Sequence, residues 1–155
     1  MAPRTRRRHE LVGHTADIGL RATAADLPAL FEEAGLALAE ASADVPAGRG
    51  GGAETHGLAE VVDLEADDLV GLAFGWLNEL IGLAQARGEA VSRTEVSALD
   101  ETATGWRLRA RVVFEPYADD GGAARARLDV KSATFHRLEV GPADGGWVLT
   151  AYLDV

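Results

Sequence analysis

The clearest pattern along the chain is the alternation of apolar and polar residues that is typical of strands with one buried face. Apolar Ile18, Leu20 and Ala22 alternate with Gly19, Arg21 and Thr23, and Trp106, Leu108, Ala110, Val112 and Phe114 repeat the same period further on. A period of two places successive side chains on opposite faces of a sheet. Both segments therefore predict half-buried strands, and residues 9–12 predict a shorter strand before the first.

Two segments follow the helical period instead. Asp26 is a predicted N-cap, with Pro28 tolerated in the first turn behind it. The apolar stripe of this helix comprises Leu27, Leu30, Phe31, Ala34, Ala37, Leu38 and Ala41. Asp67 or Asp68 is predicted to cap a second helix, whose stripe comprises Leu69, Leu72, Ala73, Trp76, Leu77, Leu80 and Ala84. Both patterns are those of amphipathic helices with one face in the core.

The remaining pattern predicts further strands at residues 58–65, 91–99, 135–140 and 147–153. Loops are expected at residues 46–53 and 116–122, and a hairpin turn at residues 141–146. We therefore predict an α+β fold, a two-layer sandwich of two helices on one mostly antiparallel sheet of six or seven strands. Residues 9–155 are expected to form a single domain, preceded by a flexible basic tail at residues 1–8.

Composition narrows the class of protein. The chain has 155 residues and no cysteine, which excludes disulfides, thiolate zinc sites and cysteine nucleophiles. Its net charge of −10 disfavours direct, non-specific binding to phosphate backbones, though not a role beside RNA. We see no apolar run approaching the roughly 20 residues that span a bilayer, so we expect a cytoplasmic protein without a membrane partner. Arg107, Arg109 and Arg111 share one strand face, which is either a phosphate contact or an ordinary solvated face.

Familiar catalytic signatures are missing from the sequence. The glycines of residues 48–52 lack the Lys-Ser/Thr pair of a phosphate-binding loop, and no Gly-x-Ser-x-Gly or His-Glu-x-x-His motif occurs. The four histidines have no metal-ligand spacing. A conventional nucleophilic or zinc enzyme is therefore disfavoured.

Oxygen ligands at the two ends of the chain are the strongest chemical signal. Asp17 follows His14, while Asp154 and Val155 end the sequence, so a side-chain and a main-chain carboxylate lie close together there. If the fold brings Asp17 alongside, three hard oxygen donors converge, a set suited to Mg²⁺ or Ca²⁺. The alternative is a solvated Asp154 at a fraying end. Lys131 is the only lysine beside fourteen arginines, and its compact ammonium suits a phosphate or a carboxylate cluster.

Five segments in order resemble the archease family, whose members activate the GTP-dependent RNA-splicing ligase. The matching segments are His14-Thr15-Ala16-Asp17-Ile18, Asp68-Leu69, Trp76-Leu77-Asn78-Glu79-Leu80, Val130-Lys131-Ser132-Ala133-Thr134-Phe135-His136 and Asp154-Val155. The resemblance implies an α+β fold with a strand-helix-strand-strand module. It also implies a non-enzymatic activator that promotes ligase guanylylation and multiple turnover, and that meets GTP and RNA only through the ligase.

The same resemblance implies site residues. The metal ligands would be Asp17, Asp154 and the main-chain carboxylate of Val155, holding Ca²⁺ or Mg²⁺, with Mn²⁺ as a further option. His14, Lys131 and Glu115 would contact the partner or its nucleotide. This chain departs from the family pattern at three positions: Gly13 replaces a common acidic residue, Phe114 replaces the glycine before Glu115, and Phe135 replaces a tyrosine.

Two other functions remain open at this stage. The first is a metal-dependent phosphate-ester hydrolase with Asp17 and Asp154 as ligands and His14 or His136 as general base. The second is a chaperone or adaptor for RNA-modifying enzymes, in which the metal is only structural. Turnover without a ligase would identify the first, and activation that survives loss of Asp17 would identify the second.

Overall fold

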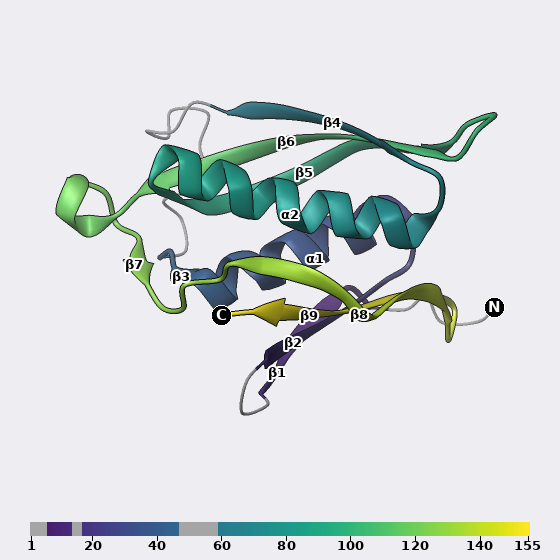
Figure 1. Cartoon of the computed structure of the whole chain (residues 1–155), viewed down its shortest axis with the longest axis horizontal. Coiled ribbons are helices and arrows are strands. Elements are labelled where there is room, and N and C mark those ends of the chain that lie inside the picture. Colours follow the sequence, from purple (N-terminus) through teal and green to yellow (C-terminus); the bar gives the residue numbers. More distant parts are fainter. Residues whose placement is uncertain (1–5, 14–16, 47–58) are drawn as a thin grey trace.

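The computed structural model describes residues 6–13, 17–46 and 59–155, and its elements follow one another as Figure 1 shows. They are β1 (Arg8–Gly13), β2 (Asp17–Ala24), α1 (Leu27–Ser42), β3 (Ala43–Asp44), β4 (Glu60–Ala66), α2 (Leu69–Arg87), β5 (Glu89–Glu101), β6 (Trp106–Pro116), the 3₁₀ turn η1 (Ala118–Asp120), β7 (Arg125–Ala126), β8 (Ser132–Ala143) and β9 (Gly146–Asp154). The predicted loop at residues 46–53 and the start of the predicted strand at Leu58 lie almost entirely outside the described residues.

The strands of the described residues form three separate antiparallel sheets. Four strands join in the order β1-β2-β9-β8, three in the order β4-β6-β5, and β3 pairs with β7 alone. Figure 1 shows α1 and α2 lying between the two larger sheets. Helix α1 packs on β5 of one sheet and β2 of the other, while α2 packs on β4 and β8.

The α+β class is therefore confirmed, but the prediction of one sheet in a two-layer sandwich is corrected. The helices form a middle layer with a sheet on each side. The physical reason is that each sheet has one apolar face to bury, and a helix with a wide apolar surface can cover two such faces at once. The alternation along each strand shows that a face is buried, without showing which strands share a sheet.

The strand-helix-strand-strand module is present as β4, α2, β5 and β6. Strand β6 lies between β4 and β5 and pairs antiparallel with both, so β4 and β5 run parallel to each other. Helix α2 makes the crossover that such a parallel arrangement requires. This confirms the module that the family resemblance implied.

Both helices begin at the aspartates that the sequence suggested. The Asp26 carboxylate accepts a hydrogen bond of 2.9 Å from the Ala29 amide, and the Asp68 carboxylate accepts one of 2.7 Å from the Gly71 amide. Asp68, rather than Asp67, is therefore the cap of α2. Helix α2 ends at Gly88, whose φ of 65° is a left-handed conformation that glycine adopts without strain.

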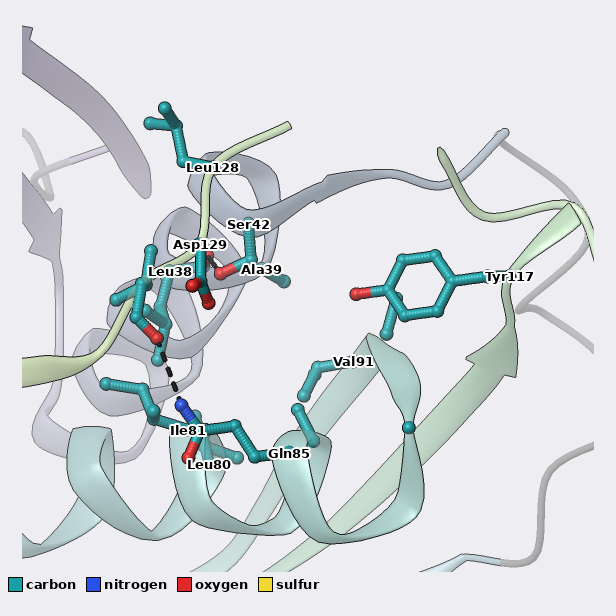
Figure 2. Close-up of a pocket in the computed structure, with 14 residues that line it drawn as sticks. Leu38, Ala39, Ser42, Leu80, Ile81, Gln85, Val91, Tyr117, Leu128 and Asp129 are labelled. Carbon is teal, nitrogen blue, oxygen red and sulfur yellow. Dashed lines mark hydrogen bonds between the residues drawn. The ribbon is translucent and has the colours of Figure 1, made fainter. Parts of the chain in front are cut away.

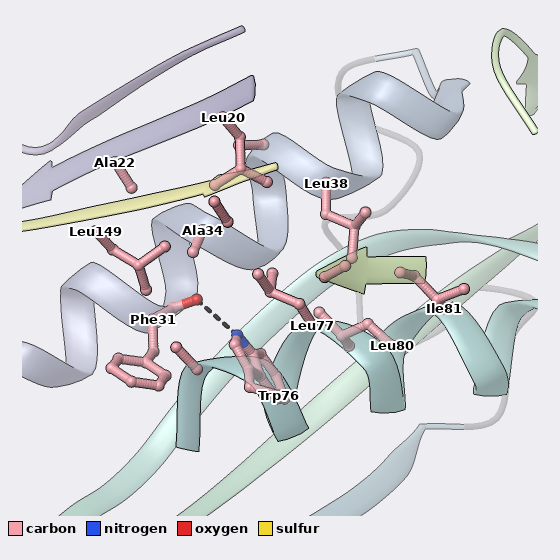
Figure 3. Packing of buried hydrophobic residues seen from close by; sticks show 14 of the residues in the cluster. Leu20, Ala22, Phe31, Ala34, Leu38, Trp76, Leu77, Leu80, Ile81 and Leu149 are labelled. Carbon is pink, nitrogen blue, oxygen red and sulfur yellow. Dashed lines mark hydrogen bonds between the residues drawn. The ribbon is translucent and has the colours of Figure 1, made fainter. Parts of the chain in front are cut away.

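The core lies where the two helices meet between the sheets. Figure 3 shows Leu20 and Leu149 of the four-stranded sheet facing Phe31 of α1 and Trp76 of α2. All four side chains are completely buried. The Trp76 indole N–H donates a 2.8 Å hydrogen bond to the Phe31 carbonyl, so the largest buried side chain also joins the two helices.

Helix α2 corrects one sequence expectation. Among the described residues it is the one helix long and apolar enough to cross a membrane by length and composition alone, contrary to our expectation that no such run occurs. Its buried residues are Leu72, Ala73, Trp76, Leu77, Leu80 and Ile81. They pack into the core between the sheets, where an apolar helix is also required.

The last residues of the predicted tail at residues 1–8 contact the rest of the fold. The tail was predicted to extend to Arg8, yet β1 begins at that residue. The Arg7 guanidinium also pairs with Glu32 and Glu33 on α1. Residues 1–5 lie outside the part of the chain described.

The hairpin between β8 and β9 is tighter than predicted. Its turn consists of Asp144 and Gly145 alone, with a Gly145 φ of 74°, instead of residues 141–146. An Asp-Gly pair is the common sequence for such a two-residue turn. Pairing of β8 with β9 is interrupted after Thr134 and resumes at Glu139, and Arg137 within this bulge has a φ of 56°.

Candidate metal and partner site at the chain end

The register of the four-stranded sheet brings the start of β2 next to the C-terminal end of the chain. Asp17, the first residue of β2, lies directly opposite Asp154, the last residue of β9. Asp154 is in turn opposite Ser132, the first residue of β8. Directly opposed residues in antiparallel strands have Cβ atoms about 4.5–5.5 Å apart. The pairing thus places the Asp17 and Asp154 side chains side by side, as the sequence hypothesis required.

Both carboxylates lie on the solvent-facing side of this sheet. Leu20 of β2 and Leu153 of β9 are completely buried, so these alternating positions face the helices. Asp17 and Asp154 have the opposite parity and are exposed. The alternative, a solvated Asp154 at a fraying end, is correct about exposure but not about fraying, because Asp154 pairs with a strand on each side.

No cation of the described residues neutralises this pair. Among the described residues, ion pairs involve Glu10, Glu32, Glu33, Glu40, Glu60, Asp63, Glu89 and Glu95, but neither Asp17 nor Asp154. Like charges directly opposed across strands are destabilising. Two carboxylates held in this way form a set of hard oxygen donors whose repulsion a divalent cation would relieve.

Lys131 is held at the same place by its backbone. Its amide donates a 2.8 Å hydrogen bond to the Asp154 carbonyl, which extends the pairing of β8 with β9 by one residue. The Lys131 side chain is exposed. The structure therefore brings together Asp17, Asp154 and Lys131, three of the residues that the sequence singled out from widely separated positions.

Side chains alone do not complete a metal site. The described residues contain no group of three or more His, Cys, Asp or Glu side chains arranged to hold a metal. The third donor expected from the sequence was the main-chain carboxylate of Val155, which follows Asp154 directly. The Val155 residue is 38% exposed, so its position leaves it accessible to solvent.

Glu115 is not part of this arrangement. It lies on β6 of the other large sheet, opposite Ala90, and is only 2% exposed. Its carboxylate accepts a 3.1 Å hydrogen bond from the Ala123 amide, which fixes the turn after β6. We therefore leave Glu115 out of the site proposed below. His14 lies outside the described residues.

Asn78 is a residue whose role sequence reasoning missed. On α2, its side-chain amide donates to the Ala133 carbonyl at 3.1 Å and accepts from the Ala133 amide at 3.0 Å. This double hydrogen bond attaches the start of β8, and with it Lys131 and Ser132, to the core helix. Asn78 was within one of the family-like segments, but only the tertiary contact shows what it holds.

An aromatic pair joins the same strand, β8, to α2. Phe135, which is 57% exposed, stacks on Phe74 of α2 with ring centroids 3.8 Å apart and an interplanar angle of 8°. The Phe135 ring thus has an aromatic partner on the neighbouring helix.

The arginines on one face of β6 were predicted to be either a phosphate contact or an ordinary solvated face, and their surroundings favour the solvated face. Arg107 is opposite Glu65 on β4 and Asp100 on β5, and its guanidinium binds Asp63 at 2.8 and 3.0 Å. Arg111 is likewise opposite Glu95. Because carboxylates flank these arginines, the face is a solvated, charge-balanced surface and not a basic patch.

Comparison with known proteins agrees with these observations. The Archease protein family (MTH1598/TM1083) matches residues 9–155. This chain belongs to the archease family.

Curated relatives match almost end to end. Protein archease of Pyrobaculum calidifontis is 33% identical over 142 residues, covering 92% of this chain and 91% of that protein. Protein archease of Thermococcus gammatolerans is 33% identical over 144 residues, covering 92% and 94%.

Solved structures share the archease fold. The solution structure of Methanobacterium thermoautotrophicum protein 1598 matches with a TM-score of 0.73 and 28% identity, covering 95% of this chain and 98% of that one. A Thermotoga maritima crystal structure, described as an archease and possible chaperone, matches with a TM-score of 0.51 and 18% identity over 93% and 94% of the two chains. The latter likeness concerns the fold alone.

Proposed function

We propose that this archease is a non-enzymatic protein activator of a GTP-dependent RNA-splicing ligase, acting in tRNA splicing or RNA repair in the cytoplasm. Family membership supports a role as a protein that assists another. The main observation that supports a particular site is that the Asp17 and Asp154 carboxylates are opposed and unpaired, with the Lys131 backbone beside them.

The donor set fits a hard divalent cation. Asp17 and Asp154 supply side-chain oxygens, and the Val155 main-chain carboxylate supplies the third donor in this proposal. Bound Ca²⁺, Mg²⁺ or Mn²⁺ would neutralise these carboxylates and order the chain end. Oxygen ligands, without nitrogen or sulfur, are the set that these ions prefer.

The residues of this chain then have distinct tasks. Asp17 and Asp154 fix the cation at the exposed end of the sheet, while the exposed side chain of Lys131, whose backbone is bonded to Asp154, is available to a phosphate of the ligase-bound nucleotide. An ammonium on a flexible stem suits such a point contact. In this proposal GTP and RNA are bound by the ligase, and the archease acts on its guanylylation and turnover.

The test is multiple-turnover RNA ligation by the cognate ligase with GTP and Mn²⁺ or Mg²⁺. We expect wild-type archease to stimulate the reaction, and Asp17→Asn and Asp154→Asn to lose most of the stimulation. Asp119→Asn, which removes an exposed carboxylate from η1, is the matched control and should stimulate like wild type. Absence of stimulation by folded wild type contradicts the proposal.

Two further arms separate the rival functions. Incubation with phosphate esters and no ligase tests for a hydrolase, and turnover there would replace the activator proposal. Stimulation that persists in Asp17→Asn would favour an adaptor with a structural metal. Extending the chain by two residues beyond Val155 should impair stimulation, since the main-chain carboxylate is then displaced.

A further inference from the structure

A cavity of about 190 Å³ opens between the two helices on the side of β5. Leu38 of α1, Leu80 and Ile81 of α2 and Val91 of β5 supply apolar walls, and the segment containing Leu128 and Asp129 borders the opening (Figure 2). Pockets for drug-sized ligands are larger, about 300–1,000 Å³. This cavity therefore suits a small molecule with a compact apolar body.

Two polar groups face each other across this space. Figure 2 shows the Asp129 carboxylate on one side and the Tyr117 hydroxyl pointing toward it from the other. Burial and the charge of Asp129 both raise the pKa of Tyr117 above its usual 10.0, so the phenol stays protonated as a hydrogen-bond donor. An apolar space with a few convergent polar groups is the usual form of a binding site.

The other polar groups of the lining are already occupied. The Ser42 hydroxyl donates to the Leu38 carbonyl at 2.9 Å, and the Gln85 amide donates to the Val130 carbonyl at 3.4 Å. Within the described residues, Asp129 has neither a hydrogen bond from a side chain nor an ion pair. The nearby Arg127 guanidinium is engaged elsewhere, donating to the Glu40 carbonyl at 3.2 Å.

An unpaired carboxylate beside an apolar cavity selects for positive charge in the ligand. The net charge of −10 adds a general attraction for cations and repels anionic metabolites. The aromatic ring of Tyr117 next to the carboxylate is a further surface that cations favour.

We propose that this cavity binds a small primary amine carried on an apolar or aromatic body. The apolar body occupies the space between Leu38, Leu80 and Val91, and the ammonium donates to the Asp129 carboxylate at the opening. This site is separate from the chain-end carboxylates and does not depend on the proposed activation of a ligase.

The test uses the full chain, isotopically labelled, titrated with phenethylamine and followed by amide NMR. Shifts should localise to residues lining the cavity, including Leu80, Val91 and Val130. Two matched probes test the ring and the charge separately. The first, 2-phenylethanol, has the ring without the charge, and the second, ethylamine, has the charge with little apolar body. Both should bind more weakly than phenethylamine.

Three variants identify the residues responsible. Asp129→Asn should weaken phenethylamine binding about two- to fivefold, because Asp129 is exposed and an ion pair in contact with solvent contributes about 1 kcal/mol at most. Ala84→Leu, which fills part of the cavity, should weaken both ring-bearing probes. Asp100→Asn removes an equal charge from β5 outside the cavity and should leave binding unchanged.

Several outcomes would overturn the proposal. These are no localised shifts, equal loss of affinity in Asp129→Asn and Asp100→Asn, or phenethylamine shifts confined to the chain end. The last would mean that the amine is attracted only by the acidic carboxylate pair. All three variants change exposed or half-buried positions, so we expect them to fold. Their amide spectra verify that each variant is folded before its affinity is compared.

Discussion

At the scale of single residues, the structure separates carboxylates that hold the fold together from carboxylates that are left without a partner. Glu33 and Glu40 bind basic side chains from the start of the chain, whereas Asp17 and Asp154 are opposed to each other. The sequence pointed to Asp17 and Asp154 as possible ligands, but it did not show that Glu33 and Glu40 form ion pairs. Their different roles depend on what the neighbouring strands place opposite them.

The opposed pair predicts how the protein responds to divalent cations. A cation that binds only the folded state at 100 times its dissociation constant stabilises it by about 2.7 kcal/mol. We therefore expect Ca²⁺ or Mn²⁺ to raise the melting temperature of wild type. Asp17→Asn should lose this response while melting no lower than wild type without added metal, because the substitution removes like-charge repulsion.

The measurement is differential scanning calorimetry with and without the cation, and Asp119→Asn is the control that should keep the response. An equal increase in melting temperature for Asp17→Asn and wild type would contradict a metal site at the chain end.

His9 predicts a dependence of stability on pH. Its ring nitrogens lie 2.7 Å from a Glu33 oxygen and 2.6 Å from a Glu40 oxygen. Ionised carboxylates only accept, so both nitrogens must donate, which requires the protonated ring. Burial by itself lowers the pKa of His9, but the hydrogen bonds and charges of Glu33 and Glu40 outweigh it and raise the pKa above 6.5.

A raised pKa in the folded state means that protonated His9 stabilises the protein fully below about pH 6.5. The stabilisation is then lost as the pH rises through the folded-state value. We expect His9→Gln to lower the free energy of unfolding by about 1 kcal/mol at pH 6 and by much less at pH 9. Urea denaturation at both values is the measurement. A difference between wild type and His9→Gln that is the same at pH 6 and at pH 9 would contradict this role of His9.

At the scale of elements, the starts of the two helices were predicted well and the limits of strands less well. Asp26 and Asp68 cap helices because a carboxylate reaches an amide three residues ahead, a contact that needs no tertiary information. The bulge in β8 and the two-residue turn after it depend on the register with β9, which is set by packing.

Asn78 gives a test of how α2 positions β8. Asn78→Leu removes both hydrogen bonds to Ala133, so we expect a loss of about 1–3 kcal/mol in the free energy of unfolding. Hydrogen exchange at the Ala133 amide should accelerate, and stimulation of the ligase should fall because Lys131 is no longer held. Glu79→Gln, on an exposed position of the same helix, is the control. Unchanged exchange at Ala133 would show that α2 does not hold this strand.

At the scale of the whole molecule, the helices serve two sheets at once. The core is therefore continuous from the four-stranded sheet through both helices to the three-stranded sheet. Trp76 occupies its centre, and its hydrogen bond to Phe31 fixes the distance between the helices. A substitution at Trp76 therefore disturbs the packing of both large sheets.

We accordingly expect Trp76→Phe to destabilise the protein by about 2–4 kcal/mol, since it removes buried volume together with a buried hydrogen bond. Trp147→Phe, at a half-buried position in β9, should cost much less. The measurement is urea denaturation, and an unchanged m-value would show that the unfolding still exposes the same surface. Equal effects of the two substitutions would contradict a central role for Trp76.

The sequence by itself determined the elements with a local cause. Period-two alternation predicted β2 and β6, apolar spacing and capping aspartates predicted α1 and α2, and the absence of cysteine excluded thiolate chemistry. The family-like segments predicted the α+β fold and the strand-helix-strand-strand module. These features can be predicted from residues that are neighbours along the chain, or from the similarity of whole segments to a known family.

Tertiary structure decided how those elements combine. It divided the strands among three sheets, placed Asp17 of β2 opposite Asp154 of β9, and separated Glu115 from them. It also made Asn78 a link to β8 and created the cavity beside Asp129. The physical reason is that pairing and packing between distant segments depend on which apolar faces cover one another, and periodicity along a single segment carries no information about its partner.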